Sequence, residues 1–142
     1  MAKSNIKVFV SHSSADEDTV KSITHILKNA NLPVWSDQEI KPGEKWQETL
    51  EKALSEARVY LIFITPHSLK SPWANFEMGV AVSRAVSEGV KIIPVLLGGV
   101  SGKDLPPAIR TWQGIDASEM GTAELASVIE SRLEKEFKKE KD

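Results

Sequence analysis

The sequence contains no cysteine among its 142 residues. Disulfide bonds, thiolate nucleophiles and cysteine-ligated metal sites are therefore excluded, and the composition is compatible with a reducing compartment. Long apolar runs are also absent, because the longest, IIPVLLGGV at 92–100, is far shorter than the roughly 20 residues that span a bilayer. The opening residues, MAKSNIKVFV, lack the apolar segment of a signal peptide. We therefore expect a cytoplasmic protein that does not bind membranes.

Neither sign of charge is in excess, since 18 Lys and Arg stand against 20 Asp and Glu, for a formal net charge of -2. This balance argues against nucleic-acid binding by general basicity, and no basic stripe is interleaved with aromatic residues. Hydrophobic residues make up 41% of the chain and charged residues 27%, as is typical of a globular domain. We predict a single domain over 1–142, with a core from about residue 5 to 137 and a charged, solvated tail over 138–142.

The common nucleotide-binding and catalytic motifs are missing. The segment GGVSGKD is the nearest to a phosphate-binding loop, but only three residues separate Gly98 from Gly102 where the motif has four. Asp104 also follows Lys103 at the place where a Ser or Thr would bind magnesium. No G-x-G-x-x-G and no G-x-S-x-G occurs, and the three histidines are too scattered to suggest a metal site. We therefore expect neither a metal nor a resident cofactor.

Segments typical of strands alternate with segments typical of helices along the whole chain. Strands are predicted at 7–10, 32–37, 58–65, 90–97 and 111–117, and helices at 16–30, at 46–57, from 71 onward and at 122–137. This alternation predicts a parallel sheet with helices on both faces. Ligands of such sheets bind at the carboxyl ends of the strands. A phosphoacceptor receiver domain shares the pattern but needs an aspartate after its third strand, and IFITPHS at 62–68 has no acid.

The helix that begins near Ser71, in SPWANFEMG, carries the clearest candidate site. Ser71 can cap this helix, and the proline after it fits the first helical position. Trp73 and Glu77 are four residues apart, so they share one face near the helix N-terminus. Arg84 and Glu88 fall in the same narrow sector as Glu77. That sector is either an ordinary solvated face or a ligand site in which an unpaired carboxylate lies beside an exposed indole.

Four stretches together resemble the TIR (Toll/interleukin-1 receptor) domain family, most closely its prokaryotic members. They are KVFVSHSSADED at 7–18, LPVWSDQEIKPGEKW at 32–46, ARVYLIFITPHSLKSPWANFEMGVA at 57–81 and KIIPVLL at 91–97. Each fragment alone would be weak, but the combination is specific and covers roughly residues 5 to 137. The resemblance implies a flavodoxin-like three-layer α/β sandwich with five parallel strands.

The resemblance also implies one of two functions. Some TIR domains cleave the nicotinamide–ribose bond of NAD+, using the glutamate that matches Glu77, and give ADP-ribose or a cyclic isomer, often in antiphage or innate immune signalling. Others are adaptors that act only by TIR–TIR assembly. A nucleoside deoxyribosyltransferase-like N-glycosidase is a more distant alternative. NAD+ would be a substrate and not a cofactor, and further copies of the chain would be partners.

One carboxylate suffices for the NAD+ reaction. Ordinary glycosidases need a second one to protonate a poor leaving group, whereas nicotinamide leaves a cationic ring as a neutral molecule. An ionised Glu77 near the ribose would stabilise its oxocarbenium-like charge. Trp73 could stack on a ring of the substrate, a contact worth about 0.5–1.5 kcal/mol.

The remaining candidates lie in the loops that follow the strands. Ser11, His12 and Ser13 either donate to the ribose or phosphate of a ligand or cap the first helix. Asp37 either accepts from a ribose hydroxyl or forms a turn. The substrate-binding candidates are thus Trp73, Ser11, His12, Ser13, Asp37, Trp35 and Ser71. The loop that the family calls BB, with Lys41, Pro42, Gly43 and Glu44, is the candidate for assembly.

Two further expectations concern residues outside the candidate site. Trp46, which opens the predicted helix at 46–57, is expected in the core. Arg84 and Glu88 are expected at the surface.

Overall fold

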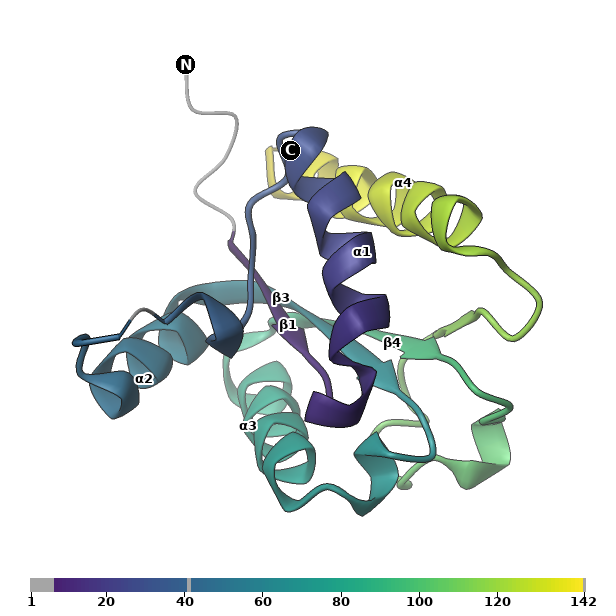
Figure 1. The fold of residues 1–142 in the computed structure, drawn as a ribbon, viewed down its shortest axis with the longest axis horizontal. Coiled ribbons are helices and arrows are strands. Elements are labelled where there is room, and N and C mark those ends of the chain that lie inside the picture. The colour runs from purple at the N-terminus through teal and green to yellow at the C-terminus, as the bar shows by residue number, and fades with distance from the viewer. Residues whose placement is uncertain (1–6, 41, 142) are drawn as a thin grey trace.

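A computed structural model describes residues 7–40 and 42–141 of the chain (Figure 1). The strands are β1 (Lys7–Ser11), β2 (Val34–Trp35), β3 (Ala57–Ile64), β4 (Lys91–Leu96) and β5 (Ile115–Asp116). The helices are α1 (Glu17–Asn29), α2 (Trp46–Glu56), α3 (Pro72–Glu88) and α4 (Thr122–Lys141). All strand pairs are parallel, in the order β2-β1-β3-β4-β5. The predicted α/β class and five-stranded parallel sheet are therefore confirmed.

Helices cover both faces of the sheet, so the molecule has three layers (Figure 1). On one face, α1 and α4 contribute the buried residues Val20, Ile23, Leu27, Leu125, Ile129 and Leu133. On the other face, α2 and α3 contribute Leu50, Leu54, Met78 and Ala81. Because β3 lies between these two layers, its side chains from Val59 to Ile64 are buried, which explains its continuous apolar sequence.

The two edge strands are shorter than predicted. β2 has two residues because Ser36 already begins a 3-10 turn, with its backbone N–H donating to the Glu39 carboxylate at 2.9 Å. β5 is preceded by turns in which Ile109 and Trp112 donate to backbone carbonyls three residues earlier. The polar and proline-containing flanks of both strands therefore form local turns in place of ladder hydrogen bonds.

Helix α4 continues through Lys141, so most of the predicted solvated tail is helical. No glycine or proline follows residue 122 to end the helix. The predicted lower limit of the core, residue 5, lies outside the described residues, as does residue 142. None of the described helices is both long enough and apolar enough to cross a membrane.

Arg84 is buried, at 9% exposure, and not at the surface as its sequence position predicts. Its guanidinium donates to the carbonyl oxygens of Leu54 and Ala57 and, at 2.9 Å, to the Tyr60 hydroxyl. These carbonyls lie where α2 ends and β3 begins, and the last carbonyls of a helix lack helical partners. Arg84 thus fixes α3 against the α2–β3 junction. Glu88 is exposed as expected and pairs with Arg84 at 2.8 Å.

Candidate active site

Most of the candidate residues gather at the carboxyl edge of the sheet. Ser11 is the last residue of β1, and Asp37 follows β2 by two residues. Helix α3 follows β3 after a short 3-10 helix, so its N-terminus lies at the same edge. The Ser71 hydroxyl accepts the backbone N–H of Ala74 at 3.1 Å, which confirms the predicted helix cap.

Glu77 is the most unusual side chain at this edge. It is only 2% exposed, so of the two alternatives for this sector of α3 the ordinary solvated face is contradicted at Glu77. The Ser11 hydroxyl donates to Glu77 Oε1 at 2.8 Å, which shows that this face of α3 is turned toward the end of β1. Among the described residues, Glu77 Oε2 is buried and has no hydrogen-bond partner.

Burial raises the pKa of Glu77 to about 8, because a buried carboxylate loses its hydration. The Ser11 hydroxyl opposes the rise, the negative charge of Asp37 adds to it, and the Trp73 indole opposes it. The raised pKa favours the protonated form of Glu77 in the unliganded protein, whereas the catalytic role expected from the sequence needs the ionised form. The same combination of burial and a nearby like charge is common at functional sites.

Trp73 and Asp37 are joined by a hydrogen bond that links the loop after β2 to helix α3. The indole Nε1 donates to Asp37 Oδ2 at 2.8 Å. Asp37 also opens the 3-10 helix Asp37–Glu39, so the turn-forming alternative for this residue is supported. Trp73 is half-buried and not fully exposed.

Two further aromatic rings contact Trp73. The centroid of Trp46 lies 5.1 Å from that of Trp73, and the Phe76 ring stacks on Trp73 at 5.3 Å. Trp46 is 47% exposed, so its predicted place in the core is wrong. Trp46 is the first residue of α2, and this helix buries Leu50 and Leu54 instead. Sequence analysis did not select Phe76, although it directly precedes Glu77.

The polar loop after β1 is buried. Ser11, His12 and Ser13 are each no more than 7% exposed. The Ser13 hydroxyl donates to Asp16 Oδ2 at 2.7 Å and makes no side-chain cap bond. Burial lowers the pKa of His12, and the nearby negative charges of Asp37, Glu17 and Asp16 oppose this effect.

Asp16 and Thr65 are residues that sequence analysis missed. The Thr65 hydroxyl donates to Asp16 Oδ2, the oxygen that also accepts from Ser13. Thr65 and Asp16 are 49 positions apart in the sequence. Their positions in the sequence could have indicated them, because Asp16 belongs to the loop after β1 and Thr65 immediately follows β3. Both positions are therefore at the carboxyl edge.

The remaining candidates, Trp35 and residues 41–44, are not part of the group around Glu77. Trp35 packs on Phe9 at 5.6 Å and lines an open groove of about 400 Å³ with Pro33 and Ala53. Pro42, Gly43 and Glu44 form an exposed turn, in which Gly43 has a φ of 90 that favours glycine. Lys41 lies outside the described residues. Within 7–40 and 42–141, no three His, Asp or Glu side chains are grouped to hold a metal ion.

The geometry defines an α/β protein whose polar site lies at the carboxyl edge of a parallel sheet. A family model described as the TIR domain matches residues 8–131. The chain belongs to the TIR domain family, and the resemblance noted in the sequence is confirmed.

Three similar proteins have different functions. The 2' cyclic ADP-D-ribose synthase BtTIR of Bacteroides thetaiotaomicron is 30% identical over 89 residues, 61% of this chain and 31% of that protein. The NAD(+) hydrolase TirS of Staphylococcus aureus is 31% identical over 127 residues, 86% of this chain and 45% of that protein. The human Toll/interleukin-1 receptor domain-containing adapter protein is 28% identical over 112 residues, 77% of this chain and 50% of that protein. The chain thus spans no more than half the length of these relatives.

Solved structures share the fold. The TIR-STING receptor from C. gigas has a TM-score of 0.70 at 27% identity, over 92% of this chain and 41% of that one. The TIR domain of the Toll-related receptor TRR-2 from Hydra magnipapillata has a TM-score of 0.69 at 14% identity, over 92% and 97% of the two chains. The flavodoxin-like arrangement is therefore that of TIR domains.

Proposed function

We propose that this TIR domain cleaves the bond between nicotinamide and ribose in NAD+, with Glu77 as the catalytic residue. The main supporting observation is the buried Glu77 carboxyl group. One of its oxygens accepts from Ser11, and the other has no hydrogen-bond partner among residues 7–40 and 42–141. Leaving a buried polar atom unsatisfied costs about 1–3 kcal/mol, so an arrangement of this kind calls for a functional reason. Two relatives, an NAD(+) hydrolase and a 2' cyclic ADP-D-ribose synthase, support NAD+ as the substrate.

The reaction requires the carboxylate form of Glu77. In the free protein its pKa is about 8, but the positive nicotinamide ring favours the charged form of a nearby acid. Binding of NAD+ would therefore release the Glu77 proton to solvent. The same carboxylate would then stabilise the positive charge that develops on the ribose as neutral nicotinamide leaves.

The nucleophile decides the product. Attack by water on the ribose carbon, with loss of a proton, gives ADP-ribose. Attack by an adenine nitrogen or a ribose hydroxyl of the same molecule gives a cyclic isomer. One relative is named as a cyclic ADP-D-ribose synthase and another as an NAD(+) hydrolase. We therefore propose cleavage of NAD+, and the experiment below identifies which product forms. Either product would suit innate immune or antiphage signalling.

Access to Glu77 requires a rearrangement, because the carboxyl group is 2% exposed. Trp73 lies one helical turn from Glu77, and its indole acts on the pKa of the Glu77 carboxyl group. Association with a second TIR domain through the exposed turn at 42–44 is a means of displacing the covering residues. The reaction should therefore be assayed at high protein concentration.

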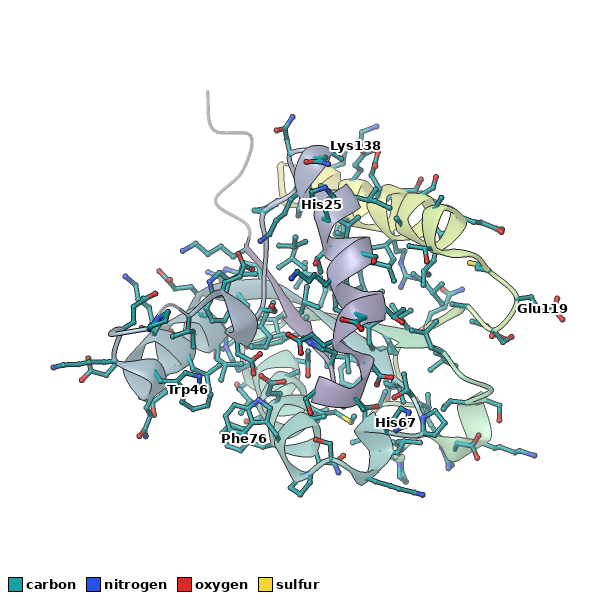
Figure 2. All side chains as sticks on the ribbon, viewed as in Figure 1. His25, Trp46, His67, Phe76, Glu119 and Lys138 are labelled. Atoms are coloured by element: carbon teal, nitrogen blue, oxygen red, sulfur yellow. The ribbon has the colours of Figure 1, made fainter. Side chains whose placement is uncertain are left out.

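Nicotinamide release from NAD+, followed by chromatography with mass detection, tests the proposal. Glu77→Gln keeps the shape of the protonated acid but cannot ionise, so we expect kcat/KM to fall at least ~100-fold, as when an electrostatic group is removed elsewhere. Glu119→Gln is the matched control, because Glu119 is an exposed glutamate far along the chain (Figure 2). Equal activity of Glu77→Gln and the wild type would overturn the assignment.

An adaptor that acts only by assembly is the second candidate. The human adapter protein among the relatives favours it. This function predicts that Glu77→Gln preserves TIR–TIR association and signalling. Co-sedimentation of the variant with the wild-type domain, together with absent nicotinamide release in both, would support the adaptor.

A further inference from the structure

Exposed aromatic rings are rare on this molecule and are concentrated at one place. Among the described residues, the large hydrophobic side chains that are exposed are Trp46 at 47%, Phe76 at 52% and Val86 at 81%. Two of these three contact the same ring, that of Trp73. We call Trp46, Trp73 and Phe76 the aromatic surface. A surface of this kind calls for a partner, because exposed apolar side chains are usually scattered singly.

The aromatic surface lies beside the candidate active site. Trp46 begins α2, and Trp73 and Phe76 lie in the first turns of α3, so all three are at the carboxyl edge of the sheet. Trp73, which contacts both exposed rings, lies one helical turn before Glu77. Figure 2 shows Trp46 and Phe76 close to each other at this edge. A molecule whose reacting carbon lies at Glu77 would therefore extend over or next to these rings.

We propose that the aromatic surface binds the purine base of the dinucleotide substrate, by stacking on Trp46 and Phe76. This inference rests on the proposed function, which puts the nicotinamide end of the same molecule at Glu77. Aromatic side chains bind bases through their π-faces without needing hydrogen bonds. The purine site makes the domain selective for dinucleotides over mononucleotides.

Trp73 serves the aromatic surface as its fixed centre. Its indole N–H is held by Asp37 at 2.8 Å, and its ring contacts both neighbouring rings. The outer rings, Trp46 and Phe76, retain about half of their area for a ligand. Stacking of the substrate is thus assigned to these two residues more than to Trp73.

The exposed area fits a base better than a second protein. Trp and Phe side chains offer roughly 150–250 Å² each, so two half-exposed rings present about 200 Å². A stable protein interface takes about 800 Å² from each partner. The aromatic surface is therefore well below the size of a docking face, and it matches the flat, small area of a purine ring.

Saturation-transfer NMR with adenosine monophosphate tests the proposal without any turnover. Transfer to the adenine protons is expected for the wild type, and ribose 5-phosphate, which has no base, is the ligand control. Trp46→Ala and Phe76→Ala should each reduce the adenine signal severalfold, whereas Trp46→Phe should retain most of it. Val86→Ala is the matched protein control, since Val86 is more exposed than either ring and lies about 15 Å further along α3. An adenine signal that is unchanged in both alanine variants would overturn the proposal.

Kinetics provide the second test. Trp46→Ala should lower kcat/KM for NAD+ about tenfold, in line with the loss of one base stack, and change that for nicotinamide mononucleotide less than twofold. Equal losses for both substrates would overturn the purine assignment, because they would indicate a displaced Trp73 or Glu77. A change in sedimentation without a change in adenine binding would assign the aromatic surface to a second copy and also overturn it. If the wild type releases no nicotinamide, the proposed function fails, while the NMR result still decides the purine site.

Discussion

Glu77 and Arg84 lie on the same helix, seven residues apart, and both are buried, yet their surroundings are opposite. Arg84 donates to two backbone carbonyls and the Tyr60 hydroxyl and pairs with both oxygens of Glu88. Within the described part of the chain, Ser11 donates to one oxygen of Glu77, and the other oxygen is buried without a hydrogen-bond partner. Burying a charge is costly unless it is fully paired and hydrogen-bonded. The comparison indicates that Arg84 holds the fold together, whereas the incomplete partnering of Glu77 is compatible with the catalytic role that we propose for it.

Removing Arg84 should have the largest effect on stability. Arg84→Met leaves the carbonyls of Leu54 and Ala57 without their guanidinium donor, so we expect the free energy of unfolding to fall by about 1–3 kcal/mol. Urea denaturation measures it, with Arg58→Met, at an exposed arginine of β3, as the control. A loss below about 1 kcal/mol would mean that the hydrogen bonds of Arg84 do not stabilise the junction of α2 and β3.

Removing the Glu77 charge should stabilise the protein at alkaline pH. The folded-state pKa of about 8 lies above the ordinary 4.5, so the stability from the protonated form is full below about pH 4.5 and is lost as pH rises through about 8. Within this window the free energy of unfolding of the wild type should fall relative to Glu77→Gln by about 1.4 kcal/mol per pH unit. Between pH 6 and 7.5 the difference should therefore change by about 2 kcal/mol. Parallel stability curves for the two proteins would contradict the raised pKa.

The charge of Asp37 should affect the pH dependence of activity. Asp37 raises the pKa of Glu77, so Asp37→Asn should move the midpoint of kcat/KM for NAD+ to lower pH. Asn can still accept the Trp73 N–H, which separates the charge from the hydrogen bond. Asp104→Asn, at an exposed aspartate hydrogen-bonded to Ser101, serves as the control. An unmoved midpoint would show that Asp37 does not act on Glu77 electrostatically.

Removing Glu88 should have the smallest effect. The Glu88 side chain is 48% exposed, and ion pairs at exposed helix positions are weakened by solvent screening. Glu88→Gln should therefore cost far less than Arg84→Met in the same urea experiment. Equal costs would show that Glu88, and not the carbonyl network, is the essential partner of Arg84.

Much of the fold was predictable because the signals are local. The apolar runs of β3 and β4, the Ser71 cap with its following proline and the alternation of strands and helices all appear in the sequence. The edge strands were less predictable, because two-residue strands bounded by turns carry almost no periodicity. The carboxyl-edge location of the site followed from topology alone.

The side chains of α3 were harder to assign. This helix is apolar on most sides, and the structure exposes Phe76 and Val86 while burying Glu77 and Arg84. A helical wheel groups Glu77 and Arg84 but cannot tell whether their sector faces the sheet or the solvent. The partners that decide it are distant, since Ser11 is 66 residues from Glu77 and Leu54 is 30 from Arg84.

The sequence by itself determined the α/β architecture, the start of α3 and the selection of Glu77, because periodicity, caps and the TIR motifs are written in neighbouring residues. Only the tertiary structure decided that Glu77 is buried with a raised pKa, that Asp37 holds Trp73, and that Trp46 joins an exposed aromatic surface. Each of these depends on residues brought together from separate strands and helices. Burial and hydrogen-bond partnering are set by that packing, and the pKa of a carboxyl group follows from them.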